Sequence, residues 1–384
     1  MRRGYSRGLV VVVAAMALLL SACGGSSSSS KASGSSSKCG LSLGFFGALT
    51  GDAANLGINI RDGAKLAVDQ YNTRNPNCKV DLKGFDSEGS PDKAPAVALQ
   101  AINDKTVVGI IGPAFSGESE ATGEAFSEAG LTTISASATN PKLTTLGWKT
   151  FHRVLGNDAS QGPAAGLYIK NILKDTKVFV IDDASAYGKG LADEVKTTAG
   201  SAAGTDTVQQ KQTDFSATVT KVKSSGADAV FYGGYYQEAG LLVKQLREAG
   251  VKAHFVAGDG VKDDGFIKAA GSAAAEGAIL TCPCNPPDKV QGTFFADYKA
   301  ATGRDPGTYS AEAFDAANVF LAAISAGKTS RKDILDFVGT YDAKGITKQI
   351  KFDSTGEIAK ENIVVWAYIV KNGKIVDDQE IKQQ

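Results

Sequence analysis

Short apolar runs alternate with segments of helical spacing along most of the chain from Leu41 onward. In a first series, strand-like runs at 41–46, 80–86, 107–111 and 131–134 are separated by helix-like segments at 58–71, 94–102 and 118–129. A second series has strand-like runs at 178–181, 229–232, 254–257 and 278–281, again with helical segments between them. Such alternation predicts an α/β fold in which parallel strands are covered by helices on both faces.

The two series predict two lobes, because 384 residues is long for a single core. Segments near 157–162 and 282–287 have the character of extended crossovers between the lobes. We therefore expect a two-lobed clamshell of Rossmann-like parallel sheets joined by a hinge of crossover segments. The predicted division is 39–157 plus 283–358 for lobe 1, and 158–282 plus 359–384 for lobe 2.

The amino terminus is typical of an export signal. A basic start precedes an unbroken apolar run at 9–20, which is short for a membrane span but suits the core of a signal peptide. The run ends in Leu-Ser-Ala-Cys at 20–23, which resembles the lipobox of bacterial lipoproteins. The resemblance implies removal of 1–22 and a lipid on Cys23, with the Gly/Ser-rich segment 23–38 as a flexible tether. The alternative is an ordinary secreted protein with a chance cysteine.

Export places the other cysteines in an oxidising setting, where disulfides persist. Cys39 and Cys78 each stand at the start of a predicted strand. If those strands are parallel neighbours, a Cys39–Cys78 bridge is feasible. A bridge between Cys282 and Cys284, across one proline, is possible but not settled by the sequence. A redox or metal role for this pair has no supporting residues nearby.

Composition argues against several classes of protein. Acidic and basic residues balance at 41 each and no basic run occurs, which disfavours nucleic-acid binding. Only two histidines, His152 and His254, are present, without the paired spacing of a metal site. Neither a phosphate-binding loop nor a Gly-x-Ser-x-Gly nucleophile elbow is found. We expect a binding protein without a cofactor or metal, and not an enzyme.

Polar turns follow the predicted strands in both series. They lie at 47–51, 112–117 and 136–140 in the first series and at 182–188, 233–236 and 258–260 in the second. Open α/β sheets bind ligands outside the carboxyl ends of their strands. The turns of both lobes are therefore expected to face a shared cleft.

Five stretches in this order resemble one known family: 112–116 (Gly-Pro-Ala-Phe-Ser), 137–143 (Ser-Ala-Thr-Asn-Pro-Lys-Leu), 160–163 (Ser-Gln-Gly-Pro), 187–190 (Tyr-Gly-Lys-Gly) and 232–236 (Tyr-Gly-Gly-Tyr-Tyr). The pattern is similar to the leucine/isoleucine/valine-binding proteins of bacterial ABC importers, which have the type I periplasmic-binding fold. The likeness covers nearly all of the chain from about Cys39. It implies a receptor, lipid-anchored on the extracytoplasmic face of the membrane, that delivers a branched-chain or related amino acid to an ABC permease.

The resemblance also assigns residues to the site. It implies that Ser116 and Thr139 hold the ligand α-carboxylate, that Ala138 turns its carbonyl to the α-ammonium, and that Tyr235 and Asp259 close over the ammonium. The implied side-chain pocket is walled by Leu56, Ala114, Phe115, Tyr187 and Phe314. Two departures leave the ligand open: Asp259 stands where the family has Glu, and Leu56 where an aromatic residue is common.

Simpler interpretations remain for single residues. Ser116 and Thr139 are common helix caps, and Asp259 between two glycines is a typical turn former. Two other functions also fit parts of the pattern. One is a sensory receptor of the same fold for another small amino acid or amide, and the other is a secreted enzyme with a cleft active site.

Overall fold

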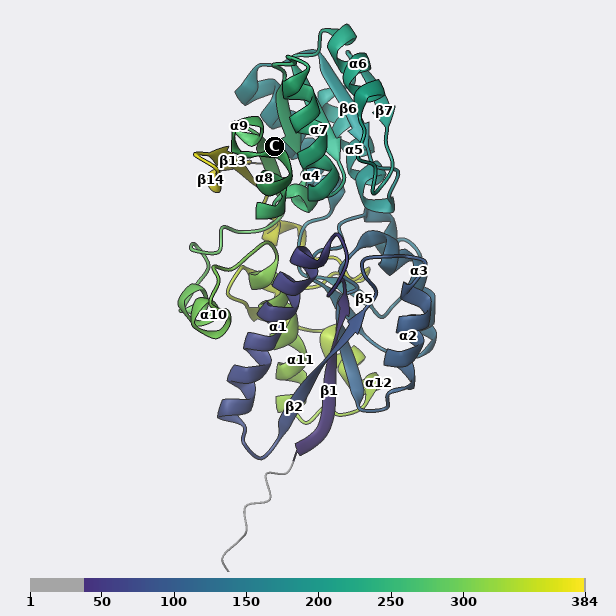
Figure 1. The fold of residues 1–384 in the computed structure, drawn as a ribbon. Helices are drawn as coiled ribbons and strands as arrows, with labels where there is room; N and C mark the ends of the chain where they lie inside the picture. Colours follow the sequence, from purple (N-terminus) through teal and green to yellow (C-terminus); the bar gives the residue numbers. More distant parts are fainter. Residues whose placement is uncertain (1–37, 383–384) are drawn as a thin grey trace, which may run out of the picture. The chain divides into compact units, whose positions relative to one another are not determined.

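The computed structural model describes residues 38–382. The predicted leader at 1–22, the tether up to residue 37 and the lipidation site Cys23 lie outside the described residues. Among the helices between residues 38 and 382, none combines the length and hydropathy that a membrane crossing requires. The fold class expected from the sequence is confirmed: strands and helices form two α/β lobes (Figure 1).

The first lobe is built on a five-stranded sheet in which all strands are parallel. In spatial order its strands are β2 (Lys79–Asp86), β1 (Lys38–Gly47), β3 (Val107–Ile111), β4 (Thr133–Ser135) and β5 (Phe151–Arg153). The helices of this lobe are α1 (Ala54–Arg74), α2 (Ala94–Asn103), α3 (Ser116–Glu128), α10 (Phe294–Thr302), α11 (Ser310–Ser325) and α12 (Arg331–Val338). A short hairpin, β11 (Asp342–Lys344) with β12 (Gln349–Lys351), follows them.

Alternation along β1 explains why helices cover both faces of this sheet. Phe45 packs in the cluster that contains α1 and α11, whereas Phe46 packs in the cluster of α2 and α3. Phe46 meets Phe126 of α3 edge to face, with ring centroids 5.6 Å apart. Successive side chains of a strand point to opposite faces, so a continuous apolar run produces a sheet buried on both sides.

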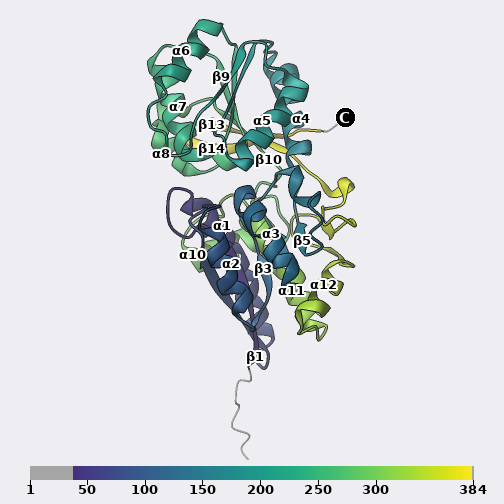
Figure 2. The same cartoon turned by 90° about the vertical axis from the view of Figure 1, so that its right-hand side faces the viewer.

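The second lobe contains a seven-stranded sheet. Its order is β14 (Lys374–Glu380), β13 (Trp366–Lys371), β10 (Ile279–Cys282), β9 (His254–Ala257), β8 (Ala229–Gly233), β6 (Val178–Asp182) and β7 (Gly204–Thr207). Only β13 runs opposite to the other strands, so its pairings with β10 and β14 are antiparallel. Its helices are α4 (Asp158–Leu167), α5 (Ala186–Ala199), α6 (Ser216–Ser225), α7 (Tyr236–Glu248), α8 (Asp264–Ala270) and α9 (Ser272–Ala275). Figure 2 shows α4 and α5 on one side of this sheet and α6, α7 and α8 on the other.

The chain passes between the sheets after β5, returns after β10 and passes again before β13. The C-terminal segment therefore adds two strands, β13 and β14, to the second sheet. The boundary residues of the two predicted lobes stay a prediction. The expected extended crossover at 157–162 is wrong, because α4 begins at Asp158 directly after an extended Asn157. The sequence did not predict this helix because Pro163 lies inside it, and proline is uncommon in helix interiors.

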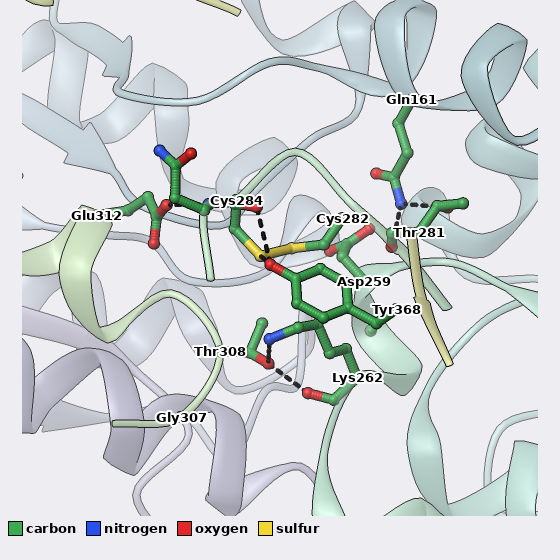
Figure 3. Close-up of a disulfide and its surroundings, with 12 residues drawn as sticks. Gln161, Asp259, Lys262, Thr281, Cys282, Cys284, Gly307, Thr308, Glu312 and Tyr368 are labelled. Atoms are coloured by element: carbon green, nitrogen blue, oxygen red, sulfur yellow. Dashed lines mark hydrogen bonds between the residues drawn. A yellow bond between two sulfur atoms is a disulfide. The ribbon is translucent and has the colours of Figure 1, made fainter. Parts of the chain in front are cut away.

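Two disulfides join the cysteines of the described chain. Strands β1 and β2 are parallel neighbours, and the predicted Cys39–Cys78 bridge is confirmed with a Cα–Cα distance of 4.5 Å. Cys282 and Cys284 also pair, with Cα atoms 5.1 Å apart. This second bridge is buried where β10 leaves the second lobe, and the Tyr368 hydroxyl donates to the Cys284 carbonyl at 3.1 Å (Figure 3).

Candidate functional site

A pocket lies where the carboxyl ends of the strands of both sheets meet. It is lined by Leu56, Ile60, Ala114, Phe115, Ser116, Ser137, Tyr187, Tyr235, Asp259, Gly260 and Tyr309. These residues come from the turns after β3, β4, β8 and β9, from the start of α1, α3 and α5, and from the residue before α11. The expectation that strand-end turns of both lobes face one cleft is therefore met by the positions of these side chains.

Seven of the ten residues expected to contact a ligand line this pocket: Leu56, Ala114, Phe115, Ser116, Tyr187, Tyr235 and Asp259. Ala138, Thr139 and Phe314 do not. Four further residues, Ile60, Ser137, Gly260 and Tyr309, were not expected. Ile60 stands one helical turn after Leu56, a spacing that could have identified it.

The first-lobe face depends on the loop between β3 and α3. Phe115 is extended, and its N–H donates to Glu118 Oε2 at 3.2 Å. The Ser87 hydroxyl donates to the other oxygen of Glu118. Burial raises the pKa of Glu118 to about 7, and the hydrogen bonds from Ser87 and Phe115 oppose that rise. A buried carboxyl group thus holds the loop that carries Ala114, Phe115 and Ser116.

The turn after β4 is tied to the same loop. Ser135 Oγ donates to the Pro113 carbonyl at 2.8 Å, and Ser137 Oγ donates to the Ala114 carbonyl at 2.6 Å. Ser137 lines the pocket, whereas Ala138 points its carbonyl to Arg153 Nη1, 2.7 Å away. Arg153 is fully buried, and the Ala138 carbonyl is paired with it within the protein. The expected contact of this carbonyl with a ligand stays a prediction.

The second-lobe face is built around Asp259. The Tyr187 hydroxyl donates to Asp259 Oδ1 at 2.8 Å and accepts the N–H of Gly260 at 2.9 Å, so this tyrosine is fully paired. Asp259 is buried, and this burial raises the pKa of its carboxyl group, whereas the hydrogen bond from Tyr187 opposes the rise. A buried carboxylate at the end of a pocket is suited to a ligand cation.

Close backbone contact brings the two tyrosine-bearing turns together. A Cβ atom on Gly188 would lie 2.5 Å from the Gly233 carbonyl oxygen, so only glycine allows the turns to approach this closely. The rings of Tyr187 and Tyr235 consequently lie 5.2 Å apart. Tyr235 also meets Phe115 of the other lobe edge to face at 5.5 Å, which joins the two faces of the pocket.

Tyr309 is the functional candidate that the sequence did not reveal. It has φ +66°, a left-handed conformation that residues other than glycine rarely adopt, and it precedes α11. Its hydroxyl faces the Asp259 carboxyl without reaching hydrogen-bonding geometry with any described residue. Phe314, the residue expected here, lies on α11 and packs on Phe294 with ring centroids 5.4 Å apart. The cause is this backbone conformation, which turns Tyr309 to the pocket and leaves Phe314 in the core.

Hydrogen bonds between the lobes surround the pocket. Asn55 Nδ2 donates to Asp263 Oδ1 at 2.8 Å, and Asn140 Nδ2 donates to the Ala186 carbonyl at 2.5 Å. Lys262 Nζ lies 3.3 Å from Thr308 Oγ1 and 4.2 Å from the centre of the Tyr368 ring (Figure 3). Burial lowers the pKa of Lys262 to about 8. The bonds of Asn55, Asn140 and Lys262 therefore join the two lobes beside the pocket.

The remaining polar candidates have structural partners. His152 is buried against the Thr150 carbonyl, and burial lowers its pKa to about 4. His254 contacts Asp175 at 2.6 Å, at the amino end of β9 and so away from the pocket. Asp183 accepts the N–H and hydroxyl of Ser185 in its own turn. Within residues 38–382, no group of three or more His, Cys, Asp or Glu side chains is arranged to hold a metal ion.

Comparison with known proteins places this architecture in a family. Residues 40–370 match the periplasmic binding protein family. A leucine-, isoleucine-, valine-, threonine- and alanine-binding protein of Pseudomonas aeruginosa is 30% identical over 336 residues, which cover 85% of this chain and 90% of that protein. The Leu/Ile/Val-binding protein BraC3 of Rhizobium johnstonii is also 30% identical, over 88% of this chain and 93% of its own.

Solved structures support the same family assignment. The branched-chain amino acid transporter substrate-binding protein LivJ of Streptococcus pneumoniae, in complex with isoleucine, superposes with a TM-score of 0.81 at 28% identity, over 88% of this chain and 99% of its own. The leucine-binding protein LivK of Thermotoga maritima superposes with a TM-score of 0.80 at 27% identity, and the match covers 89% of this chain and 98% of LivK. The type I periplasmic-binding fold is confirmed, and this chain belongs to the periplasmic binding protein family.

Proposed function

We propose that this protein is the substrate-binding component of an ABC importer that captures a branched-chain or related amino acid in the pocket between its lobes. The observation that carries the proposal is the division of the pocket. At one end the buried carboxyl group of Asp259 lies among tyrosine side chains. At the other end lie the hydroxyl groups of Ser116 and Ser137 beside apolar side chains. An amino-acid zwitterion needs an anion for its ammonium, neutral donors for its carboxylate and an apolar surface for its side chain.

The proposed orientation follows from these groups. The ligand ammonium faces Asp259, and the ligand carboxylate lies near Ser116 at the first turn of α3, where helix N–H groups favour an anion. Leu56, Ile60 and Phe115 receive the side chain. One methylene is worth only about 1–3 kcal/mol in such a pocket, so leucine, isoleucine and valine are expected to bind with similar affinity.

An enzyme is the less favoured interpretation. Among the described pocket-lining residues there is no histidine, lysine or cysteine that could serve as a base or nucleophile beside Ser116 or Ser137. A sensory receptor of the same fold for another small amino acid or amide remains the alternative, and the ligand distinguishes the two.

Calorimetry of the purified protein against the twenty amino acids, small amides and polyols tests the proposal. We expect saturable binding of leucine, isoleucine or valine with the ligand recovered unchanged. Binding confined to amides or polyols, or conversion of the ligand to a product, would contradict it.

We further propose that the mature protein is anchored to the extracytoplasmic face of the membrane through a lipid on Cys23 and works beside its permease. The support is the lipobox-like sequence before a Gly/Ser-rich tether. Cys23→Ala is expected to move the protein from the membrane fraction to the soluble fraction, whereas a serine change within the tether, Ser28→Ala, should leave it in the membrane. Retention of the Cys23→Ala protein in membranes would refute the anchor.

A further inference from the structure

The side chain of Lys262 is buried between the two lobes, next to the proposed pocket but not part of its lining. It follows the short turn at Asp259–Val261 after β9, and 8% of the residue is exposed. Asp259 and Gly260 line the pocket, whereas Lys262 does not. Lysine is rarely buried to this extent unless an opposite charge pairs with it, so the partners of its ammonium group determine what the burial costs.

The ammonium group has few partners. Its single hydrogen bond within residues 38–382 goes to Thr308 Oγ1 at 3.3 Å, and Nζ lies 4.2 Å from the centre of the Tyr368 ring (Figure 3). An ammonium group carries three N–H donors, so two of them have no acceptor in the part of the chain that the structure describes. Glu312 is the carboxyl group that attracts this ammonium most strongly, and it does so through its charge, without a hydrogen bond.

The Tyr368 ring is held in place within the second lobe. It lies in β13, in the same sheet as β9 and β10, and its hydroxyl donates to the Cys284 carbonyl at 3.1 Å. Cys284 is itself fixed by the buried disulfide to Cys282. The ring beside the ammonium group is therefore part of a rigid second-lobe surface, and it moves together with Lys262 when the lobes separate.

The other partners belong to the first lobe. Thr308 stands two residues before α11, and Glu312 lies in the first turn of that helix. A Cβ atom on Gly307 would lie 2.1 Å from Asn59 Nδ2 of α1, so the loop before α11 packs tightly against the first lobe. Separation of the lobes would move Thr308 and Glu312 away from Lys262 and admit water to its ammonium group. This group therefore loses its hydration when the lobes close.

The surrounding groups do not offset the burial of this charge. The charged and titratable groups that face it are Glu312 from α11, Tyr368 from β13, and Asp259, Asp263 and Asp264 from its own segment. Burial outweighs the attraction of the carboxyl groups and lowers the pKa of Lys262 to about 8. Glu312 is buried as well, which raises the pKa of its carboxyl group and favours its neutral form. Replacement of a poorly paired buried ion by an apolar side chain often stabilises the state in which it is buried.

We propose that the charge of Lys262 opposes closure of the lobes, so that the ligand-bound protein opens more readily than its pocket contacts alone would allow. A group that is better solvated in the open state shifts the equilibrium toward that state, and the apparent affinity falls with the fraction of closed protein. The backbone carbonyl of Lys262, which accepts the Thr308 hydroxyl, acts in the opposite sense and joins the lobes. Affinity is thus adjusted from outside the pocket. The inference rests on the proposed amino-acid binding function.

Lys262→Met tests this inference, because it removes the charge and keeps the length of the side chain and the backbone carbonyl. Calorimetry at pH 7 compares it with wild type, using whichever of leucine, isoleucine and valine binds wild type most tightly. We expect the variant to bind about tenfold more tightly or better, and small-angle scattering should show a more compact ligand-free protein than wild type. Lys268→Met, at an exposed position of α8 in the same lobe, should match wild type in both measurements.

The pH dependence of affinity gives a second measurement. In the open protein the ammonium group is in water and keeps the ordinary lysine pKa of 10.5, whereas in the closed protein the pKa is about 8. The closed state therefore binds fewer protons, and closure becomes more favourable as the pH rises through this window. Wild-type affinity relative to that of Lys262→Met should rise about tenfold between pH 7 and pH 9, since ionisation of the ligand affects both proteins alike.

The outcomes separate this inference from the proposed function. A Lys262→Met protein that binds no more tightly than wild type, or a relative affinity that does not change with pH, overturns the inference and leaves the proposed function standing. If wild type binds none of the three amino acids, the proposed function fails, and scattering from the ligand-free proteins still decides the role of Lys262. A variant no more compact than wild type then overturns the inference, and a more compact one supports it. Should Lys262→Met fail to fold, Lys262→Gln, which is also uncharged, takes its place in every measurement.

Discussion

The two faces of the pocket are built from the same kind of turn but carry different chemistry. The second-lobe face presents Tyr187, Tyr235 and Asp259, a carboxyl group enclosed by aromatic rings. The first-lobe face presents Ser116 and Ser137 with apolar neighbours and no charge. A charged group is worth most when closure removes water from around it, so the second lobe is expected to provide most of the affinity and the first lobe most of the shape.

The strongest test of this division is Asp259→Ala. Removal of one partner of a buried charge pair leaves the other charge unpaired and costs about 2–5 kcal/mol, or about thirtyfold and more in affinity. We expect calorimetry to show at least a tenfold loss for the preferred amino acid. Asp264→Ala, an exposed acid five residues further along, should bind normally. An Asp259→Ala protein with wild-type affinity would mean that the charge on this face does not bind the ligand.

Ser116→Ala addresses the first-lobe face. Loss of one hydroxyl donor to a charged carboxylate costs about 1.5–3 kcal/mol, which is about tenfold to a little over a hundredfold in affinity. The change also removes the acceptor of the Asn140 N–H, at 3.2 Å, so thermal melting should be recorded beside binding. Ser127→Ala, near the other end of α3, is the matched control. A loss larger than that of Asp259→Ala would reverse the proposed division of labour.

The sequence predicted the second-lobe face better than the first, for a physical reason. Tyr187, Tyr235 and Asp259 each stand two to five residues after a strand, in turns fixed by glycines, so their positions follow from the strand ends. The turn after β4 has no regular period, and its side chains alternate between pocket and core. In that turn Ser137 lines the pocket and Ala138, for which a ligand contact was expected, does not.

Two features of the site had no local signal in the sequence. Tyr309 reaches the pocket through a left-handed backbone that apolar spacing cannot reveal, so Phe314 was assigned instead. Residues 158–162 form the start of α4, which the sequence did not predict because Pro163 lies inside this helix. Fold class and the strand-end location of the cleft, by contrast, depend on periodicity over many residues and were predicted correctly.

On each face of the pocket a buried carboxyl group holds a turn in place, so the pH dependence of stability from these two groups can be compared between the lobes. Glu118 holds the loop of Phe115, and Asp183 holds the turn before Tyr187 through the N–H and hydroxyl of Ser185. Burial raises the pKa of each to about 7. Because the pKa in the folded state exceeds that in the unfolded chain, folding takes up protons between about pH 4.5 and 7, and each group lowers stability as the pH rises through this window.

Glu118→Gln and Asp183→Asn should remove that dependence with little effect on affinity. For Glu118, a pKa of about 7 against 4.5 corresponds to about 3 kcal/mol, so the stability of the variant relative to wild type should rise by up to this amount from pH 4.5 to pH 8. Denaturant unfolding at several pH values measures the difference, in which the opposite contribution of His152 cancels. Glu120→Gln, on the exposed side of α3, should show no such trend. If this stability difference changes equally with pH for Glu118→Gln and Asp183→Asn, both lobes hold their pocket turns through a buried neutral carboxyl group. If the difference does not change with pH for one variant, the carboxyl group at that position stays ionised in the folded protein and holds its turn as a charged group.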